Sequence, residues 1–136
     1  MIRPIMHDES FLAQVSADAL RTDVSVARDL VDTLKENKKN CVGMAANMIG
    51  VLKRVIAFED NGKYIVMLNP VITDKTGEYT AQEGCLSLTG VRTATRYQKI
   101  EVTYQDTMFR TKKASYEGWT AQIIQHEIDH CNGILI

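Results

Sequence analysis

Proline, long hydrophobic runs and an excess of either charge are all lacking in this sequence. Only 2 of the 136 residues are proline, and 16 basic residues nearly balance 17 acidic ones, for a net charge of −1 at pH 7. Such a balance gives no electrostatic signature of nucleic-acid or anionic-membrane binding. No apolar stretch could cross a bilayer, and residues 1–20 lack the pattern of a secretion signal, so we expect a cytoplasmic protein without a membrane partner.

Cysteine is scarce as well. The 3 cysteines are odd in number and widely spaced, which does not fit a disulfide framework and indicates free thiols. What is present is the composition of an ordinary globular protein, with 45% hydrophobic residues. At this length we expect a single domain, residues 1–136, with a buried core.

The segment Gln125-His126-Glu127-Ile128-Asp129-His130 is the most informative part of the sequence. At about 3.6 residues per turn, its two histidines stand on one face of a helix, and the adjacent glutamate points toward the same pocket. Two imidazoles can bind a divalent metal, and a nearby carboxylate can move the proton of a metal-activated water. The pattern predicts a metal-dependent hydrolase with Glu127 as its general base and acid.

Two histidines leave a catalytic metal one protein ligand short. No histidine, aspartate or glutamate follows this segment, so we look for the third ligand upstream. Cys85 is the strongest candidate, because a thiolate with two imidazoles suits a tetrahedral site whose fourth position carries water, and Gly84 allows a close backbone approach. Cys131 is the competitor, but on a helix it would project about 100° away from the histidines and is expected to pack in the core.

Two of these segments carry a family resemblance. Glu83-Gly84-Cys85-Leu86-Ser87 and Gln125–His130 resemble the second and third signature motifs of the peptide deformylases. The first motif of that family has the form Gly-x-Gly-x-Ala-Ala-x-Gln, and Cys41-Val42-Gly43-Met44-Ala45-Ala46-Asn47-Met48 occupies the matching place. Cys41 replaces the first glycine of the motif, and Met48 replaces its glutamine. The resemblance extends over nearly the whole chain.

The resemblance implies hydrolysis of the formyl group from the amino-terminal methionine of nascent chains. One divalent metal would be bound by Cys85, His126 and His130, with Fe(II) as the ion in vivo and Zn(II), Ni(II) or Co(II) as substitutes. Glu127 would accept a proton from water and deliver it to the departing amine. The implied partners are N-formylated peptides or nascent chains, with a transient contact to the ribosome.

In this family, the metal, the backbone N–H after the cysteine ligand and the glutamine of the first motif stabilise the negative charge on the formyl oxygen. The backbone donor here is Leu86, whereas the thioether of Met48 donates no hydrogen bond. A weakly active or differently selective deformylase is therefore expected. Gly43 and Met44 resemble the stretch that pairs with the peptide substrate in β fashion, the alternative being an ordinary glycine-containing loop.

Other candidates and functions stay open from the sequence. Arg96 and Asp129 are candidates to orient a ligand histidine through its second ring nitrogen. The alternatives to deformylation are a related deacylase acting on other N-acyl substrates and a catalytically impaired metal-binding homologue. Glu127 argues against a purely structural metal, because a closed site has no use for a general base.

The expected fold class is α+β, with antiparallel sheets packed around a C-terminal metal-binding helix. Apolar residues at spacings of three and four predict an amphipathic helix over residues 23–37, capped by Asp23. A second helix is expected over 118–132, with Gly133 as its stop. Short β-rich runs predict strands at 54–59, 63–69, 99–105 and 109–117. We expect the metal helix to lie against a sheet edge that carries Cys85, and the lysines of 35–39 to be solvated.

Overall fold

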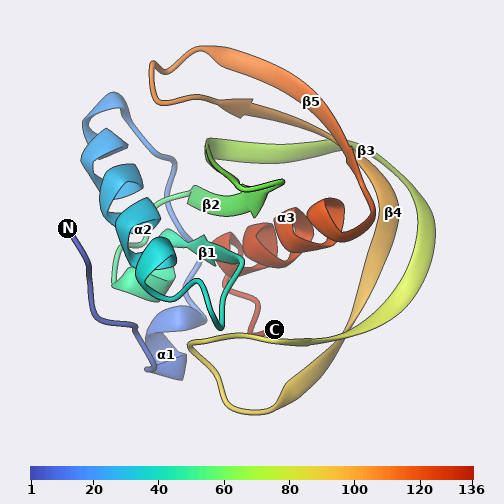
Figure 1. The fold of residues 1–136 in the computed structure, drawn as a ribbon, viewed down its shortest axis with the longest axis horizontal. Helices are drawn as coiled ribbons and strands as arrows, with labels where there is room; N and C mark the ends of the chain where they lie inside the picture. The colour runs from blue at the N-terminus through green and yellow to red at the C-terminus, as the bar shows by residue number, and fades with distance from the viewer.

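A computed structural model describes all 136 residues of the chain (Figure 1). The elements are α1 (Glu9–Leu12), η1 (Arg21–Asp23, a 3-10 turn), α2 (Val24–Glu36), β1 (Gly43–Ala45), η2 (Ala46–Ile49, a 3-10 turn), β2 (Val55–Asp60), β3 (Lys63–Gly84), β4 (Val91–Gln105), β5 (Thr111–Glu117) and α3 (Gly118–Cys131). The strands form one antiparallel sheet in the order β1-β2-β3-β4-β5. The α+β class is confirmed, although a single sheet replaces the several sheets expected. No helix is long and apolar enough to span a membrane.

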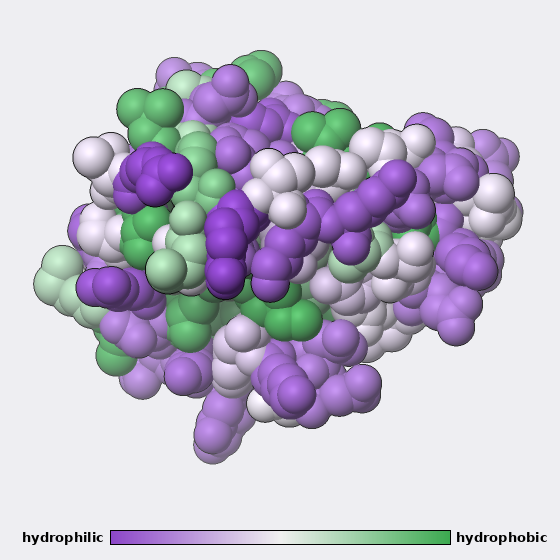
Figure 2. Space-filling model, turned by 90° about the horizontal axis from the view of Figure 1, so that it is seen from above, coloured by the Kyte–Doolittle hydropathy of each residue, from purple (hydrophilic) through white to green (hydrophobic).

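The sheet curls around α3, as Figure 1 shows for the long bend of β3 and β4. The bend follows two register shifts in the pairing of β3 with β4, between Leu68 and Val71 and between Ile72 and Asp74. Such bulges bend a strand and increase its twist, and Pro70 is tolerated at one because a bulge does not need its missing N–H. Beyond the bulges β3 is largely exposed, and this end of the molecule is mostly hydrophilic in Figure 2.

Strand β2 is buried on both faces because it lies between the two longer helices. Val55 and Ala57 belong to the hydrophobic cluster under α2, whereas Ile56 and Phe58 belong to the cluster under α3. All four side chains are fully buried. Burial of each large side chain contributes about 1.5–3 kcal/mol, so this strand joins α2 to α3 in one core. The metal motif is thereby placed on a helix that is supported along its length.

Both predicted helices are confirmed within a residue or two. Asp23, however, does not cap α2: its carboxylate accepts a hydrogen bond from the Leu20 N–H, 2.7 Å away, which closes the preceding 3-10 turn instead. Gly133 ends α3 as expected, since its φ of 73° permits the Ile134 N–H to reach the Asp129 carbonyl at 3.0 Å.

All four predicted strands are present, and two of them are much longer than predicted. β3 continues past the expected end at residue 69 to Gly84, and β4 begins at Val91 rather than 99. β1 was not predicted at all. Cys85 lies in the loop that joins β3 to β4, so it sits at the end of a hairpin of two inner strands. We had expected a sheet edge to carry it.

Candidate metal centre and active site

Three potential metal ligands converge in the structure. The sulfur of Cys85 and one ring nitrogen from each of His126 and His130 all lie within 4.8 Å of one another. The cysteine comes from the β3–β4 loop, and the histidines are neighbours on one face of α3. Both histidines are buried, and their Nε2 atoms lie 3.0 Å apart. Two imidazole nitrogens aimed at one point beside a sulfur form a donor set suited to a divalent cation.

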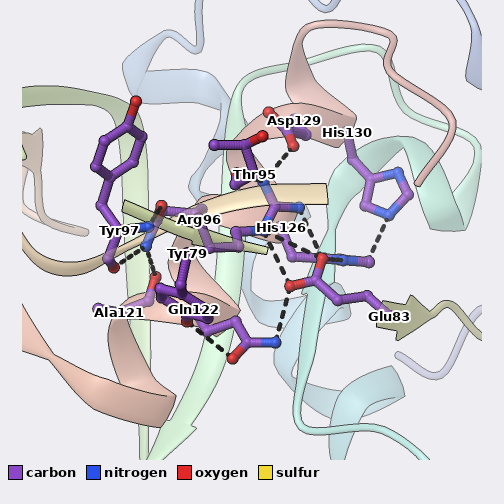
Figure 3. A network of polar contacts seen from close by, with 11 residues as sticks. Tyr79, Glu83, Thr95, Arg96, Tyr97, Ala121, Gln122, His126, Asp129 and His130 are labelled. Carbon is purple, nitrogen blue, oxygen red and sulfur yellow. Dashed lines mark hydrogen bonds and ion pairs between the residues drawn. The ribbon is translucent and has the colours of Figure 1, made fainter. Parts of the chain in front are cut away.

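Glu83 holds the first of these histidines in place. Its Oε1 lies 2.8 Å from His126 Nδ1, so the Nε2 of that ring is left facing the site. Arg96 binds the same carboxylate through two nitrogens, at 2.7 and 2.9 Å, and Gln122 donates to it at 2.9 Å. Burial alone would raise the pKa of Glu83, but the hydrogen bonds from His126 and Arg96 prevail and lower this pKa to about 2. Glu83 is therefore a carboxylate at neutral pH. Figure 3 shows its contacts with His126, Arg96 and Gln122.

Arg96 and Asp129 occupy a position different from the one expected. Arg96 Nη1 donates to Asp129 Oδ2 at 2.7 Å, and no nitrogen of either histidine ring is bonded to either residue. The chain of contacts runs from Asp129 through Arg96 to Glu83 and only then to His126, as Figure 3 shows. Arg96 and Asp129 therefore lie in the shell around the ligand histidines, but they reach His126 only through Glu83 and not through a ring nitrogen, as we had expected.

Without a metal, the two rings differ in proton affinity. Burial opposes a charge on His126, but hydrogen bonds with Cys85 and Glu83 outweigh it and raise the pKa of His126 to about 10. Burial, together with the positive charge of His126, lowers the pKa of His130 to about 3. One ring is thus protonated and the other neutral. The Nδ1 atom of His130 is buried without a hydrogen-bond partner.

Glu127 lies beside the convergent ligands and is 3% exposed. Its Oε1 is buried without any hydrogen-bond partner, and burial raises the pKa of this carboxyl to about 7. Gly43 packs directly against it, since a β-carbon at that position would lie 3.0 Å from Glu127 Oε2 and 2.6 Å from Ile123 Cγ2. A carboxyl with such a pKa can both accept and donate a proton near neutrality.

A cavity of about 360 Å³ opens onto this cluster. Cys85, His126 and Glu127 contribute to its wall. The rest of the wall comes from the stretch that ends at Gly43, from η2, from the end of β3 and the loop after it, and from the first turns of α3. These add Lys38, Lys39, Asn40, Cys41, Val42, Gly43, Met48, Gln82, Glu83, Gly84, Leu86, Trp119, Gln122 and Ile123. Its lining is of mixed polarity. A cavity of this size and character is the expected form of a small-ligand site.

Comparison with known proteins agrees with this geometry. A sequence model described as polypeptide deformylase matches residues 3–136. A peptide deformylase of Clostridium beijerinckii is 52% identical over 136 residues, which is 100% of both chains. The chain belongs to the peptide deformylase family. It is accordingly a hydrolase of a metal-dependent family.

Solved structures of peptide deformylases share the fold. One from Legionella pneumophila is 34% identical, with a TM-score of 0.88 over 99% of this chain and 83% of that chain. Another, from Acinetobacter baumannii with Met-Ala-Ser bound, is 27% identical, with a TM-score of 0.88 over 99% of this chain and 97% of that chain. The curled sheet around a central helix is thus a deformylase fold.

Met48, the main departure from the deformylase motif, lines the cavity and is 1% exposed. The adjacent Asn47 does not compensate for it. The two residues are neighbours in the 3-10 turn η2. The amide of Asn47 points away from the cavity and donates to the His130 carbonyl at 3.1 Å. Leu86, by contrast, lines the cavity, and its N–H has no intramolecular acceptor.

The other candidates named from the sequence lie outside the cavity. Met44 is fully buried in the cluster under α2 and pairs with Ala57 of β2, so its side chain does not line the cavity. Cys131 packs in the core away from the histidines, as expected.

Sequence reasoning missed Glu83 as the partner of His126. The only signal was its place two residues before Cys85, at the end of a strand whose full length was not predicted.

Proposed function

We propose that this chain removes the formyl group from the N-terminal formylmethionine of nascent polypeptides. The observation that carries the proposal is the convergence of Cys85, His126 and His130 within 4.8 Å, with Glu127 beside them at the base of the cavity. A whole-length identity of 52% to a peptide deformylase supports it independently. Action on nascent chains implies a cytoplasmic location and a transient contact with the ribosome.

The donor set suits a divalent metal that keeps one coordination position free of protein ligands. One sulfur and two imidazole nitrogens would hold such an ion and leave a further position for water, and Glu127, whose Oε1 is buried without a hydrogen-bond partner, lines the same cavity as Cys85 and His126. We assign Cys85, His126 and His130 as the ligands, with Fe(II) as the ion in vivo and Zn(II), Ni(II) or Co(II) as substitutes. When bound, the ion acidifies a water molecule and polarises the formyl carbonyl.

Glu127 moves the proton. Its Oε1 accepts a proton from the attacking water, and the same atom returns it to the amine as the bond from carbon to nitrogen breaks. The pKa of about 7 in the metal-free chain keeps both forms accessible. A cation nearby favours the carboxylate and brings the pKa of Glu127 down, which suits the first of these steps.

The formyl oxygen gains negative charge as water attacks. The free N–H of Leu86 is placed to donate to it, because Leu86 follows Cys85 directly and lines the cavity. Met48 stands where the motif glutamine would supply a second protein donor, and its thioether supplies none. We therefore propose a deformylase with a lower kcat than one that carries the glutamine.

The free edge of β1 is the proposed binding site for the peptide backbone. The Val42 carbonyl accepts from the Glu59 N–H at 2.9 Å, so the polar groups of Val42 point toward β2. Alternation along the strand then turns the N–H and carbonyl of Gly43 outward, toward the open edge. The only group on that carbonyl is the Cys41 thiol, at 2.9 Å. A substrate can add as one more strand here.

The test is hydrolysis of formyl-Met-Ala-Ser by anaerobically prepared Fe(II), Ni(II) and Zn(II) forms of the protein. We expect turnover in at least the Fe(II) form, and a loss of at least about 10²-fold in Glu127→Gln at unchanged metal content. An acetyl-Met-Ala-Ser peptide serves as the control for acyl-group selectivity. Full metal occupancy without turnover of the formyl peptide in any form would refute the proposal.

A further inference from the structure

Two lysines lie at the mouth of the deformylase cavity. Lys38 and Lys39 are the only lysine or arginine residues among those lining it. Both are exposed, and neither forms an ion pair in the structure. Sequence reasoning treated them as part of a solvated cluster, but their position gives them access to whatever enters the cavity.

The turn that carries the lysines is held in place by its own hydrogen bonds. The side-chain amide of Asn37 donates to the Thr33 carbonyl at 2.8 Å, which ties the turn to the end of α2. The Asn40 N–H donates to the Asn37 carbonyl at 2.9 Å and closes the turn. The backbone of Lys38 and Lys39 is therefore fixed relative to the cavity, while their long side chains remain free to reach a ligand.

No acidic residue in the cavity neutralises these lysines. Glu83 is bound by Arg96 and His126, as described above. Glu127 is 3% exposed at the base of the cavity. The mouth therefore presents unpaired positive charge to a peptide chain that leaves the site.

The path of a bound peptide leads to this turn. Gly43 packs against Glu127, and the end of β1 beyond Gly43 is buried. A peptide whose formyl group lies at Glu127 therefore leaves in the opposite direction, antiparallel to β1 and past Cys41. With its first residue opposite Gly43, its third residue lies opposite Cys41, beside Asn40 and Lys39, because each strand residue advances about 3.4 Å.

We propose that Lys38 and Lys39 select deformylase substrates that carry a carboxylate side chain at the third residue. The inference rests on the proposed deformylation and extends it to the choice of substrate. Exposed charge pairs contribute modestly, so we expect a preference of about fivefold over a cationic side chain. The preference is electrostatic and should weaken as salt is added.

The test compares kcat/KM for formyl-Met-Ala-Asp-amide and formyl-Met-Ala-Lys-amide, the amides removing the terminal carboxylate from both. The expected ratio is about 5 at low ionic strength, falling toward 1 at about 0.5 M salt and in the Lys38→Ala/Lys39→Ala variant. Lys35→Ala is the matched control: its ammonium lies 5.2 Å from the centre of the Tyr64 ring, outside the cavity lining, and it should keep the ratio. A wild-type ratio of 1 or less, or one that the double substitution leaves intact, would overturn the proposal.

A second readout separates this proposal from deformylation itself. Trp119 is the single tryptophan of the chain, lines the cavity and is 62% exposed. Its fluorescence should report binding of the products Met-Ala-Asp-amide and Met-Ala-Lys-amide without any need for turnover. Tighter binding of the aspartate peptide without catalysis would support selection and refute deformylation. Equal affinities for the two products together with normal catalysis would support deformylation and refute selection by the lysines.

Discussion

At position 48, a thioether stands where the family motif has a carboxamide. Met48 is almost fully buried and lines the cavity, and the one nearby amide, Asn47, is bonded to the His130 carbonyl instead. The protein donors to the oxyanion are thereby reduced to the Leu86 N–H. Since loss of one such donor typically costs about 10²–10³ in rate, this single residue should dominate the difference in kcat from motif-complete deformylases.

We expect Met48→Gln to raise kcat on formyl-Met-Ala-Ser by up to about 10², with little change in KM, because the new hydrogen bond strengthens only as charge develops. Gln is close to Met in size, but its buried amide lacks a partner in the free enzyme, so stability should fall by about 1–3 kcal/mol. Met48→Leu, which adds no donor, should leave kcat low. An unchanged kcat in Met48→Gln would contradict the oxyanion argument.

Glu83 acts on the metal site through His126. Its carboxylate fixes the ring so that Nε2 faces the other ligands, and Arg96 keeps that carboxylate charged. We expect Glu83→Gln to weaken metal affinity by about 10–100-fold, as is typical for the partner of a ligand histidine. Competition with a chelator measures this directly. Glu78→Gln, an exposed change on the same strand, is the control, and equal affinities in the two variants would contradict the role of Glu83.

At the scale of elements, β1 brings the peptide-binding edge against the catalytic helix. Only glycine allows that approach at position 43, where a β-carbon would lie 2.6 Å from Ile123 Cγ2 and 3.0 Å from Glu127 Oε2. Gly43→Ala should therefore push β1 away from α3, destabilise the fold by about 1–3 kcal/mol and reduce kcat/KM more than 10-fold.

Thermal unfolding and formyl-peptide kinetics of the same sample test the Gly43→Ala expectation. Gly84→Ala is a suitable control for stability, because a β-carbon there would meet only the Gly90 carbonyl, at an ordinary 3.7 Å. If Gly43→Ala kept the Tm and the kinetics of the wild-type protein, the contact between β1 and α3 would adjust to the added methyl group without a change in stability or activity.

The same elements show how far the sequence predicts the fold. The helix over 23–37 was found because its apolar residues repeat at helical spacing, and the helix over 118–132 because the His126–His130 segment is helical and Gly133 stops it. β1 was missed because three residues buried on both faces show no alternation. β3 was cut short because its residues beyond the bulges face solvent and hydrogen-bond mainly to β4, so local composition does not mark them as strand.

The site could be predicted where chemistry and local spacing coincide. His126, Glu127 and His130 lie within one helical turn or so, and Cys85 was chosen by its ligand chemistry. The link from Glu83 to His126 joins residues 43 positions apart and depends on the bend of β3, which no local pattern encodes. The role of Lys38 and Lys39 at the cavity mouth depends in the same way on where the turn after α2 ends.

For the molecule as a whole, the buried general base carries a cost in stability that depends on pH. Burial raises the pKa of Glu127 from 4.5 in the unfolded chain to about 7 in the metal-free fold. A carboxyl whose pKa is raised in the folded state makes its full contribution to the free energy of unfolding below pH 4.5. That contribution is lost as the pH rises through 7. At about 1.4 kcal/mol per pKa unit, the metal-free protein should lose about 3 kcal/mol from this residue between pH 4.5 and pH 8.

Glu127→Gln should remove this loss, because an amide of nearly the same shape does not ionise. We expect denaturant unfolding in the presence of a chelator to show a smaller drop in unfolding free energy from pH 5 to pH 8 for the variant, by about 2–3 kcal/mol. Comparing the pH dependence cancels any constant cost of burying the amide. With metal bound, the wild-type protein should instead show the smaller drop in unfolding free energy, because a cation beside Glu127 stabilises its carboxylate form. Equal pH dependence in the two metal-free proteins would mean that Glu127 keeps an ordinary pKa in the fold.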